Sequence, residues 1–177
     1  IKGGDVTFND VVFTGNKVIS SVAGNGVVTV GGAVFLDQTR NSVKVDGVDV
    51  NANVETTATF NISRDLTYAG NTIVNTNEKA TTTVYGGKAY SSGGFLFMDR
   101  HSTANFNVSE GATLTLGMLN SSDKNADTIA SSMTTDADAT TYGGHNLITK
   151  QGVGTFVINS SLNDYNGLVD VQKGSLV

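Results

Sequence analysis

The chain has 177 residues, and Thr (23), Val (22), Gly (21) and Asn (18) make up nearly half of it, whereas Glu occurs three times, so the composition favours β structure with tight turns over helices. Its net charge of −5 argues against a nucleic-acid-binding surface, and no apolar run approaches the ~20 residues of a membrane helix. The absence of Cys excludes a disulfide framework and any thiolate metal site.

Short half-buried strands are expected in three similar segments. Residues 6–9 (VTFN) recur as 58–61 (ATFN) and 104–107 (ANFN), with apolar and polar residues alternating in each. Period-2 runs separated by Gly and Asn are typical of short strands joined by tight corners. A second motif, residues 31–37 (GGAVFLD), returns as residues 93–99 (GGFLFMD).

These repeats favour one β architecture. A sandwich gives no reason for repeated motifs, and a propeller would carry an aromatic signature although this chain has no Trp. We predict a right-handed parallel β-helix, a single-stranded solenoid in which equivalent residues of successive coils stack as Phe and Asn ladders. The absence of Pro agrees, because nearly every backbone N–H of such a stack is donated to a neighbouring coil.

The chain is expected to form a single β-helical segment over residues 1–177, interrupted once. In residues 120–141, 15 of 22 residues are Ser, Thr, Asn or Asp, with no alternation, which predicts a polar loop that leaves the helix. Because the sequence starts at Ile1 and stops at Val177 inside a patterned strand, we expect it to be a fragment of a longer protein.

The last quarter of the chain carries a family resemblance. Residues 152–158 (GVGTFVI) lead through Tyr165 into residues 166–177 (NGLVDVQKGSLV). This stretch, about residues 147–177, resembles the autotransporter-associated β-strand repeat, from which it departs at Leu168 and Val169, where the family usually has a second Gly or Thr.

Upstream segments resemble a related group. Residues 13–16 (FTGN) and 31–34 (GGAV) are similar to the F-x-x-N and G-G-A-[ILV] pair of polymorphic outer-membrane proteins and related autotransporter adhesins. A second, degenerate pair lies at residues 68–71 and 93–96.

The resemblance implies a passenger segment of a type V secreted protein, displayed on a Gram-negative cell surface. It implies a non-catalytic role in adhesion, self-association or biofilm formation, with a host or bacterial surface protein, a glycan or a second passenger copy as partner. It places any membrane anchorage in a translocator domain outside this segment, and we expect no cofactor.

A β-helical polysaccharide lyase, hydrolase or polysaccharide-binding module is the alternative. Carboxylates for it could come from Asp46 and Asp49, or from Asp37 and Asp99 if their coils register, in which case an Arg or a cation must lie between them. Asp99 and His101 are expected on one side of a strand with Arg100 facing away, and no nucleophile elbow accompanies them. We therefore predict no catalytic residue.

Two groups of polar residues are candidate ligand contacts. Asp123, Asp127, Asp136 and Asp138 could bind Ca²⁺ but lack the EF-hand and nonapeptide patterns, so a solubilising acidic loop is expected instead of a metal site. Tyr85, Tyr90 and Tyr142 near Gly-Gly turns are candidates for exposed contacts. The phenylalanines are expected to form a stacked core ladder: Phe8, Phe13, Phe35, Phe60, Phe95, Phe97 and Phe106.

Overall fold

The protein is described by a computed structural model that covers residues 1–20, 28–39, 42–51, 53–75, 90–119, 126–132, 144–160 and 165–177. These residues form strands β1 to β18 and no helix, so the fold is all-β. Most strand pairs are parallel, as the sequence predicts. No helix in the described ranges is long and apolar enough to cross a membrane.

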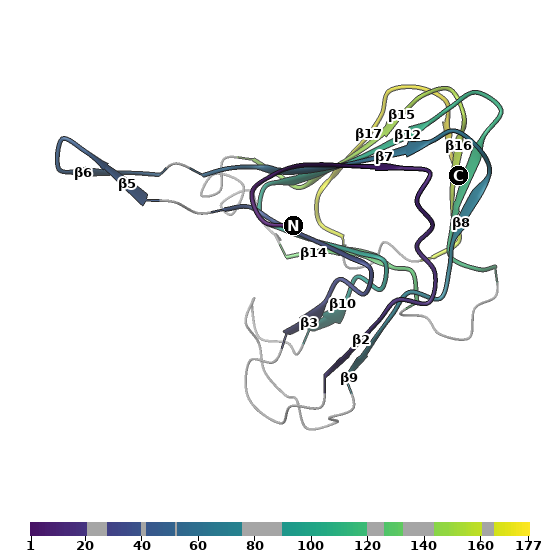
Figure 1. Cartoon of the computed structure of the whole chain (residues 1–177), viewed down its shortest axis with the longest axis horizontal. Coiled ribbons are helices and arrows are strands. Elements are labelled where there is room, and N and C mark those ends of the chain that lie inside the picture. Colours follow the sequence, from purple (N-terminus) through teal and green to yellow (C-terminus); the bar gives the residue numbers. More distant parts are fainter. Residues whose placement is uncertain are drawn as a thin grey trace.

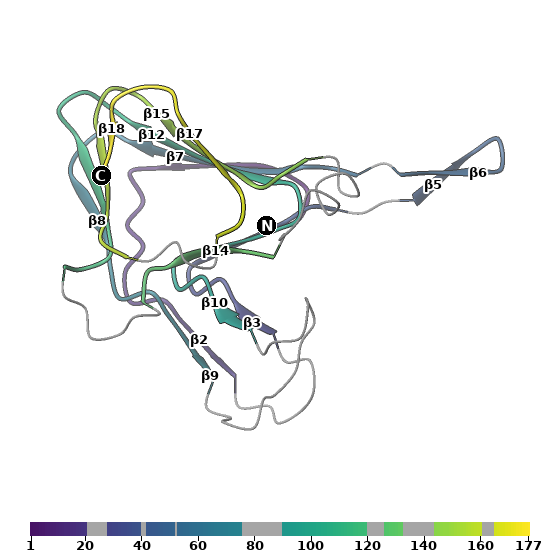
Figure 2. The same cartoon turned by 180° about the vertical axis from the view of Figure 1, so that it is seen from behind.

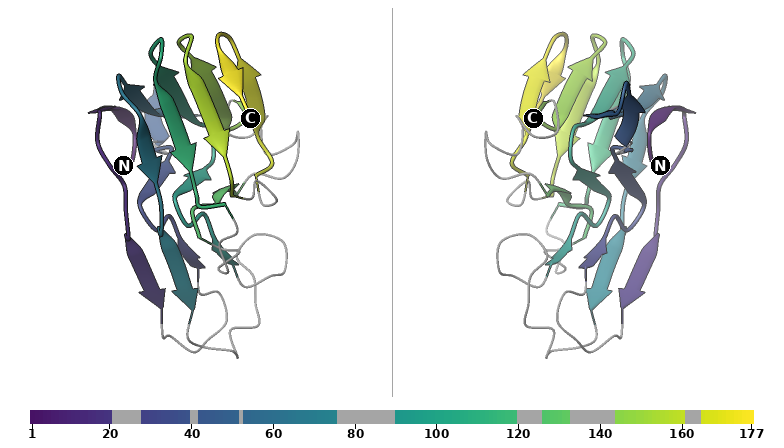
Figure 3. Two further views of the ribbon diagram at one scale, coloured as in Figure 1. Left: turned by 90° about the vertical axis from the view of Figure 1, so that its right-hand side faces the viewer. Right: turned by 90° about the vertical axis from the view of Figure 1, so that its left-hand side faces the viewer.

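The largest sheet holds the three repeated segments side by side, in the order β1-β7-β12-β15-β17 with every neighbour parallel. Figure 3 shows these strands running from purple to yellow in chain order. Phe8 lies opposite Phe60, and Phe60 opposite Phe106, so equivalent positions of the repeats share one register. The strands are β1 (Gly4–Asn9), β7 (Thr56–Ile62), β12 (Ser102–Val108), β15 (Leu147–Gln151) and β17 (Leu168–Val171).

Two further parallel sheets complete the body, and Figure 1 shows the three sheets around a common interior. Each of β7, β12, β15 and β17 is followed directly along the chain by a strand of the second sheet. That sheet contains β8 (Leu66–Tyr68), β13 (Thr113–Leu116), β16 (Thr155–Ile158) and β18 (Ser175–Leu176). The third contains β4 (Val34–Asp37), β11 (Leu96–Asp99) and β14 (Ile129–Ser131).

Stacked aromatic rings fill the interior. The ring centroids of Phe8 and Phe60 are 5.1 Å apart, those of Phe60 and Phe106 4.8 Å, and those of Phe106 and Phe156 4.6 Å. The predicted Phe ladder is therefore confirmed for the first sheet. It is wrong for Phe35, which is 37% exposed because the alternation of β4 turns its neighbours Val34 and Leu36 inward instead.

The predicted polar loop at residues 120–141 is wrong for the part of it that the structure describes. Strand β14 pairs in parallel with β11, and Ile129 and Ala130 are fully buried. The amides of Phe95 and Leu96 donate to the carbonyl of Thr128. Residues 126–132 thus add a third strand to a core sheet. Two adjacent apolar residues are sufficient for this, because the neighbouring strand satisfies the backbone hydrogen bonds of the segment. Residues 120–125 and 133–141 lie outside the described residues.

In the described part of the chain, two excursions leave the body. Strands β5 (Ser42–Val45) and β6 (Val48–Asn51) form an antiparallel hairpin that projects far to one side in Figures 1 and 2. Its turn, Asp46 (φ 52°) and Gly47 (φ 83°), is the Asp-Gly combination that favours a type I′ hairpin.

The second excursion consists of two parallel strand pairs. Both extend away from the body on the lower side of Figure 1. Strand β2 (Lys17–Ser20) pairs with β9 (Thr72–Asn75), and β3 (Val28–Val30) pairs with β10 (Tyr90–Ser92).

Candidate functional site

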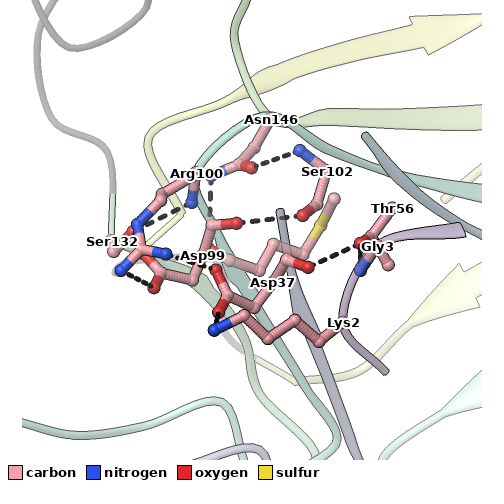
Figure 4. A network of polar contacts seen from close by, with 10 residues as sticks. Lys2, Gly3, Asp37, Thr56, Asp99, Arg100, Ser102, Ser132 and Asn146 are labelled. Atoms are coloured by element: carbon pink, nitrogen blue, oxygen red, sulfur yellow. Dashed lines mark hydrogen bonds and ion pairs between the residues drawn. The ribbon is translucent and has the colours of Figure 1, made fainter. Parts of the chain in front are cut away.

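Two stacked carboxylates form the centre of a polar cluster (Figure 4). Asp37 ends β4 and lies in register with Asp99, which ends β11, and both residues are buried. The guanidinium of Arg100 lies between them, with Nη1 2.8 Å from Asp37 Oδ1 and Nη2 3.4 Å from Asp99 Oδ2. The expectation that an Arg or a cation lies between these two Asp residues when their coils register is confirmed, and the group is the Arg100 guanidinium.

The residues before β1 and the first residue of β7 extend this cluster. Lys2 Nζ lies 3.6 Å from Asp37 Oδ2. The Thr56 hydroxyl donates to the Asp37 carbonyl at 2.5 Å and accepts from the Gly3 amide at 2.7 Å. These contacts join the third sheet to the start of the first sheet.

The opposite side of the cluster is joined by hydroxyl and amide groups. The Ser132 hydroxyl donates to Asp99 Oδ1, and the Ser102 hydroxyl donates to the Asp99 carbonyl at 2.9 Å. Asn146 accepts from the Ser102 amide at 3.0 Å and donates to the Met98 carbonyl at 3.2 Å (Figure 4). These contacts hold the corner between the first and third sheets together.

The prediction that His101 and Asp99 lie on one side of a strand is wrong. Strand β11 ends at Asp99, and Arg100 takes a left-handed conformation (φ 54°), so the period-2 alternation stops before His101. For the same reason the prediction that Arg100 faces away is wrong, because the turn brings its guanidinium back to both carboxylates. His101 Nε2 instead lies 3.8 Å from Glu55 Oε1.

Of the seven candidate ligand residues, Asp127 is the one whose side chain the structure describes. Asp123, Asp136, Asp138, Tyr85 and Tyr142 lie outside the described residues, as does the side chain of Tyr90, which begins β10.

Asp127 is 1% exposed, so it is not the solvated residue of an acidic loop. Its carboxylate accepts hydrogen bonds from the amides of Gly70 (2.8 Å) and Asn71 (2.9 Å) and from Asn71 Nδ2 (2.8 Å). Asp127 thus acts as a clamp that fixes the turn at residues 70–71. In the described ranges no three His, Asp or Glu residues are placed to hold a metal ion.

Sequence reasoning missed a groove at the corner between the first and second sheets. Its volume is about 470 Å³. It is lined by Asn107, Ser109, Glu110, Gln151, Gly152, Val153, Gln172 and Lys173. Asn107 and Gln151 stand near the ends of β12 and β15, and the other lining residues come from the turns that follow β12, β15 and β17. No local pattern in the sequence indicates that these segments meet, because their register is set by the pairing of strands far apart in the chain.

A column of side-chain amides leads to this groove. Asn61 Nδ2 donates to Asn9 Oδ1 at 2.8 Å, and Asn107 Nδ2 donates to Asn61 Oδ1 at 3.1 Å. On the far side, Gln151 Nε2 donates to Gln172 Oε1 at 3.3 Å. The predicted Asn ladder therefore exists and continues into the groove as Gln residues.

Comparison with known proteins yields a similarity to an autotransporter. The chain is 25% identical over 193 residues to the probable autotransporter YfaL of Escherichia coli (strain K12), an alignment that covers 97% of this chain and 14% of YfaL. No protein-family model and no solved structure matches the chain. This similarity supports a relation to autotransporters, of which the chain spans about a seventh of one member.

Proposed function

We propose that this chain is a segment of the passenger of a surface-displayed autotransporter, folded as a right-handed parallel β-helix and acting as a non-catalytic scaffold for adhesion or self-association. The observation that carries the proposal is the unbroken parallel register from β1 through β7, β12 and β15 to β17. Repeated strand–turn–strand units of this kind stack into a stiff rod. The similarity to YfaL supports the passenger assignment.

The mechanism is display. The stacked body holds its excursions away from the core, and the β5–β6 hairpin presents Val45 and Val48 to solvent at 53% and 65% exposure. Many weak polar contacts along a rod add through multivalency, so no single tight pocket is required. The partners we propose are a host or bacterial surface protein, a glycan or a second passenger copy, and the membrane is reached through a translocator domain outside this segment.

The described polar cluster supports a non-catalytic role over a polysaccharide-degrading one. A glycosidase needs two carboxylates that reach the scissile bond. Asp37 and Asp99 are instead buried against Arg100, so they hold the corner together and do not face a substrate.

Bacteria that display the parent protein, with and without residues 1–177, provide the test. Deletion should abolish clumping or surface binding, and the soluble chain added to wild-type cells should compete for the same partner. An antibody against a retained part of the passenger controls for display. Normal clumping and binding by well-displayed deletion cells would reduce the segment to a spacer and overturn the proposal.

A further inference from the structure

The stacked turns that line the groove are joined by a buried cation. Residue 150 occupies the position of the Phe ladder, opposite Phe106, but it is a fully buried Lys. Its ammonium donates to the carbonyls of Gln151 (2.8 Å), Gly152 (2.9 Å) and Lys173 (3.1 Å). Two successive turns are thereby tied to one cation, and the groove between them is held in shape.

Close backbone packing adds to this rigidity. A Cβ on Gly152 would lie 2.1 Å from the Val108 carbonyl oxygen, and one on Gly174 would lie 2.3 Å from the Gly154 carbonyl oxygen. Both glycines have positive φ, 72° and 71°. The turns can stack at this distance only with Gly at these positions, so the groove is a pre-formed feature of the fold.

The residues that line the groove carry several side-chain groups able to bind hydroxyls. Asn107, Gln151 and Gln172 supply carboxamides, which both donate and accept. The Ser109 hydroxyl, the Glu110 carboxylate and the Lys173 ammonium make no hydrogen bond or ion pair with another side chain in the described part of the protein. The negative charge of the Glu110 carboxylate and the positive charge of the Lys173 ammonium cancel, so the groove favours an uncharged ligand.

The backbone at the groove offers little to a peptide. The carbonyls of Gln151, Gly152 and Lys173 already accept from Lys150, and the amides of Gly154 and Gln172 already donate to backbone carbonyls. Strand addition by a peptide needs unpaired backbone groups, and these groups are already paired.

We propose that this groove binds a neutral oligosaccharide whose chain runs across the turns. Successive strands are about 4.8 Å apart, close to the length of one pyranose ring, so each turn can meet one sugar residue with one carboxamide. Glu110 would accept from vicinal hydroxyls, and Val153 would contact a sugar face. The inference deepens the proposed adhesive role by assigning it a glycan ligand.

The test is an NMR titration of the full ¹⁵N-labelled chain with cellotetraose, xylotetraose and chitotetraose, and with tetragalacturonate and an Asn- and Thr-rich peptide as comparators. At least one neutral tetrasaccharide should shift the amide signals of residues 107–110, 151–153 and 172–173. Loss of one hydrogen bond corresponds to roughly five-fold weaker binding, which is the effect expected for Glu110→Gln and for Gln172→Leu.

Glu55→Gln is the matched control, because it makes the same change at a partly exposed Glu outside the groove, and it should leave binding unchanged. Unchanged circular dichroism and unfolding temperature establish that each variant is folded. The proposal is overturned if no neutral sugar binds at about 10 mM, a level that detects even weak sites. Preferential binding of the peptide or of tetragalacturonate, or equal loss in the Glu55 variant, overturns it too.

Failure of this titration is distinguishable from failure of the proposed function. Cells that still clump through residues 1–177 while no neutral sugar binds would retain the adhesive role and remove the groove from it.

Discussion

Removing one ring from the aromatic stack tests the core most directly. Phe106 is fully buried, and its ring lies 4.8 Å from Phe60 at an interplanar angle of 8° and 4.6 Å from Phe156. A buried Phe→Ala change costs about 3–5 kcal/mol of unfolding free energy. Each lost contact between aromatic rings accounts for about 0.5–1.5 kcal/mol, so a Phe with ring partners on both sides is not expected at the lower end of this range. Because Phe106 has rings on both sides, we expect Phe106→Ala to destabilise the fold by about 4 kcal/mol.

Phe35→Ala is the matched control. Phe35 is 37% exposed and has a ring partner in Phe97 at 5.9 Å, so its truncation should cost about 1–2 kcal/mol. Urea unfolding followed by far-ultraviolet circular dichroism measures both values, since the chain has no Trp for fluorescence. A loss below about 2 kcal/mol for Phe106→Ala, or equal losses for the two variants, would refute the conclusion that the buried ring stack stabilises the core.

Substitutions at Lys150, Arg100 and Asp127 address the polar groups. Lys150→Met should destabilise the fold by about 1–3 kcal/mol at pH 7, because three carbonyls lose their donor. Burial lowers the pKa of Lys150 in the folded chain below its ordinary 10.5, so between these two pKa values the unfolded chain binds more protons than the folded one. The stability of the wild type relative to Lys150→Met should therefore rise as the pH rises from neutral towards 10.5. Urea titrations across that range measure the difference in unfolding free energy, and a difference that stays constant would contradict the reasoning. Arg100→Leu should cost about 3 kcal/mol at neutral pH because it leaves Asp37 and Asp99 buried side by side, and adding Asp37→Asn should recover part of the loss; a double-mutant cycle with no recovery would count against the ion-pair explanation. Asp127→Ala should cost about 2 kcal/mol and Asp127→Asn less, since Asn keeps an acceptor and tolerates positive φ; equal thermal shifts for both would contradict the clamp.

Local pattern was enough to predict the repeated strands. Alternation at residues 58–61 and 104–107 identifies the inward positions, because a side chain in a strand has only two faces to choose between. The stacking of Asp37 over Asp99 also followed from the repeated motif, and the need for an Arg or a cation between them followed from charge repulsion. That Arg100 supplies this charge did not follow, because strand alternation placed its side chain on the opposite face.

Another feature was readable in the sequence but was missed. Asp46-Gly47 between Val-rich runs is a strong hairpin signal, and the structure forms the β5–β6 hairpin around it.

The burial of Asp127 was not readable in the sequence. Composition shows that a segment is polar, but it does not show which amide donates to each carboxylate.

The sequence by itself determined the all-β class, the parallel pairing of like segments and the inward positions of the ladder, because these depend on local periodicity and on identical residues repeating. Only the tertiary structure decided that Lys150 replaces a Phe inside the stack, that Ile129 and Ala130 join a core sheet, and that the turns at residues 107–110, 151–153 and 172–173 enclose a groove. Each of these features depends on which groups from turns far apart in the sequence come within hydrogen-bonding distance of one another. A local stretch of sequence does not specify which distant groups meet.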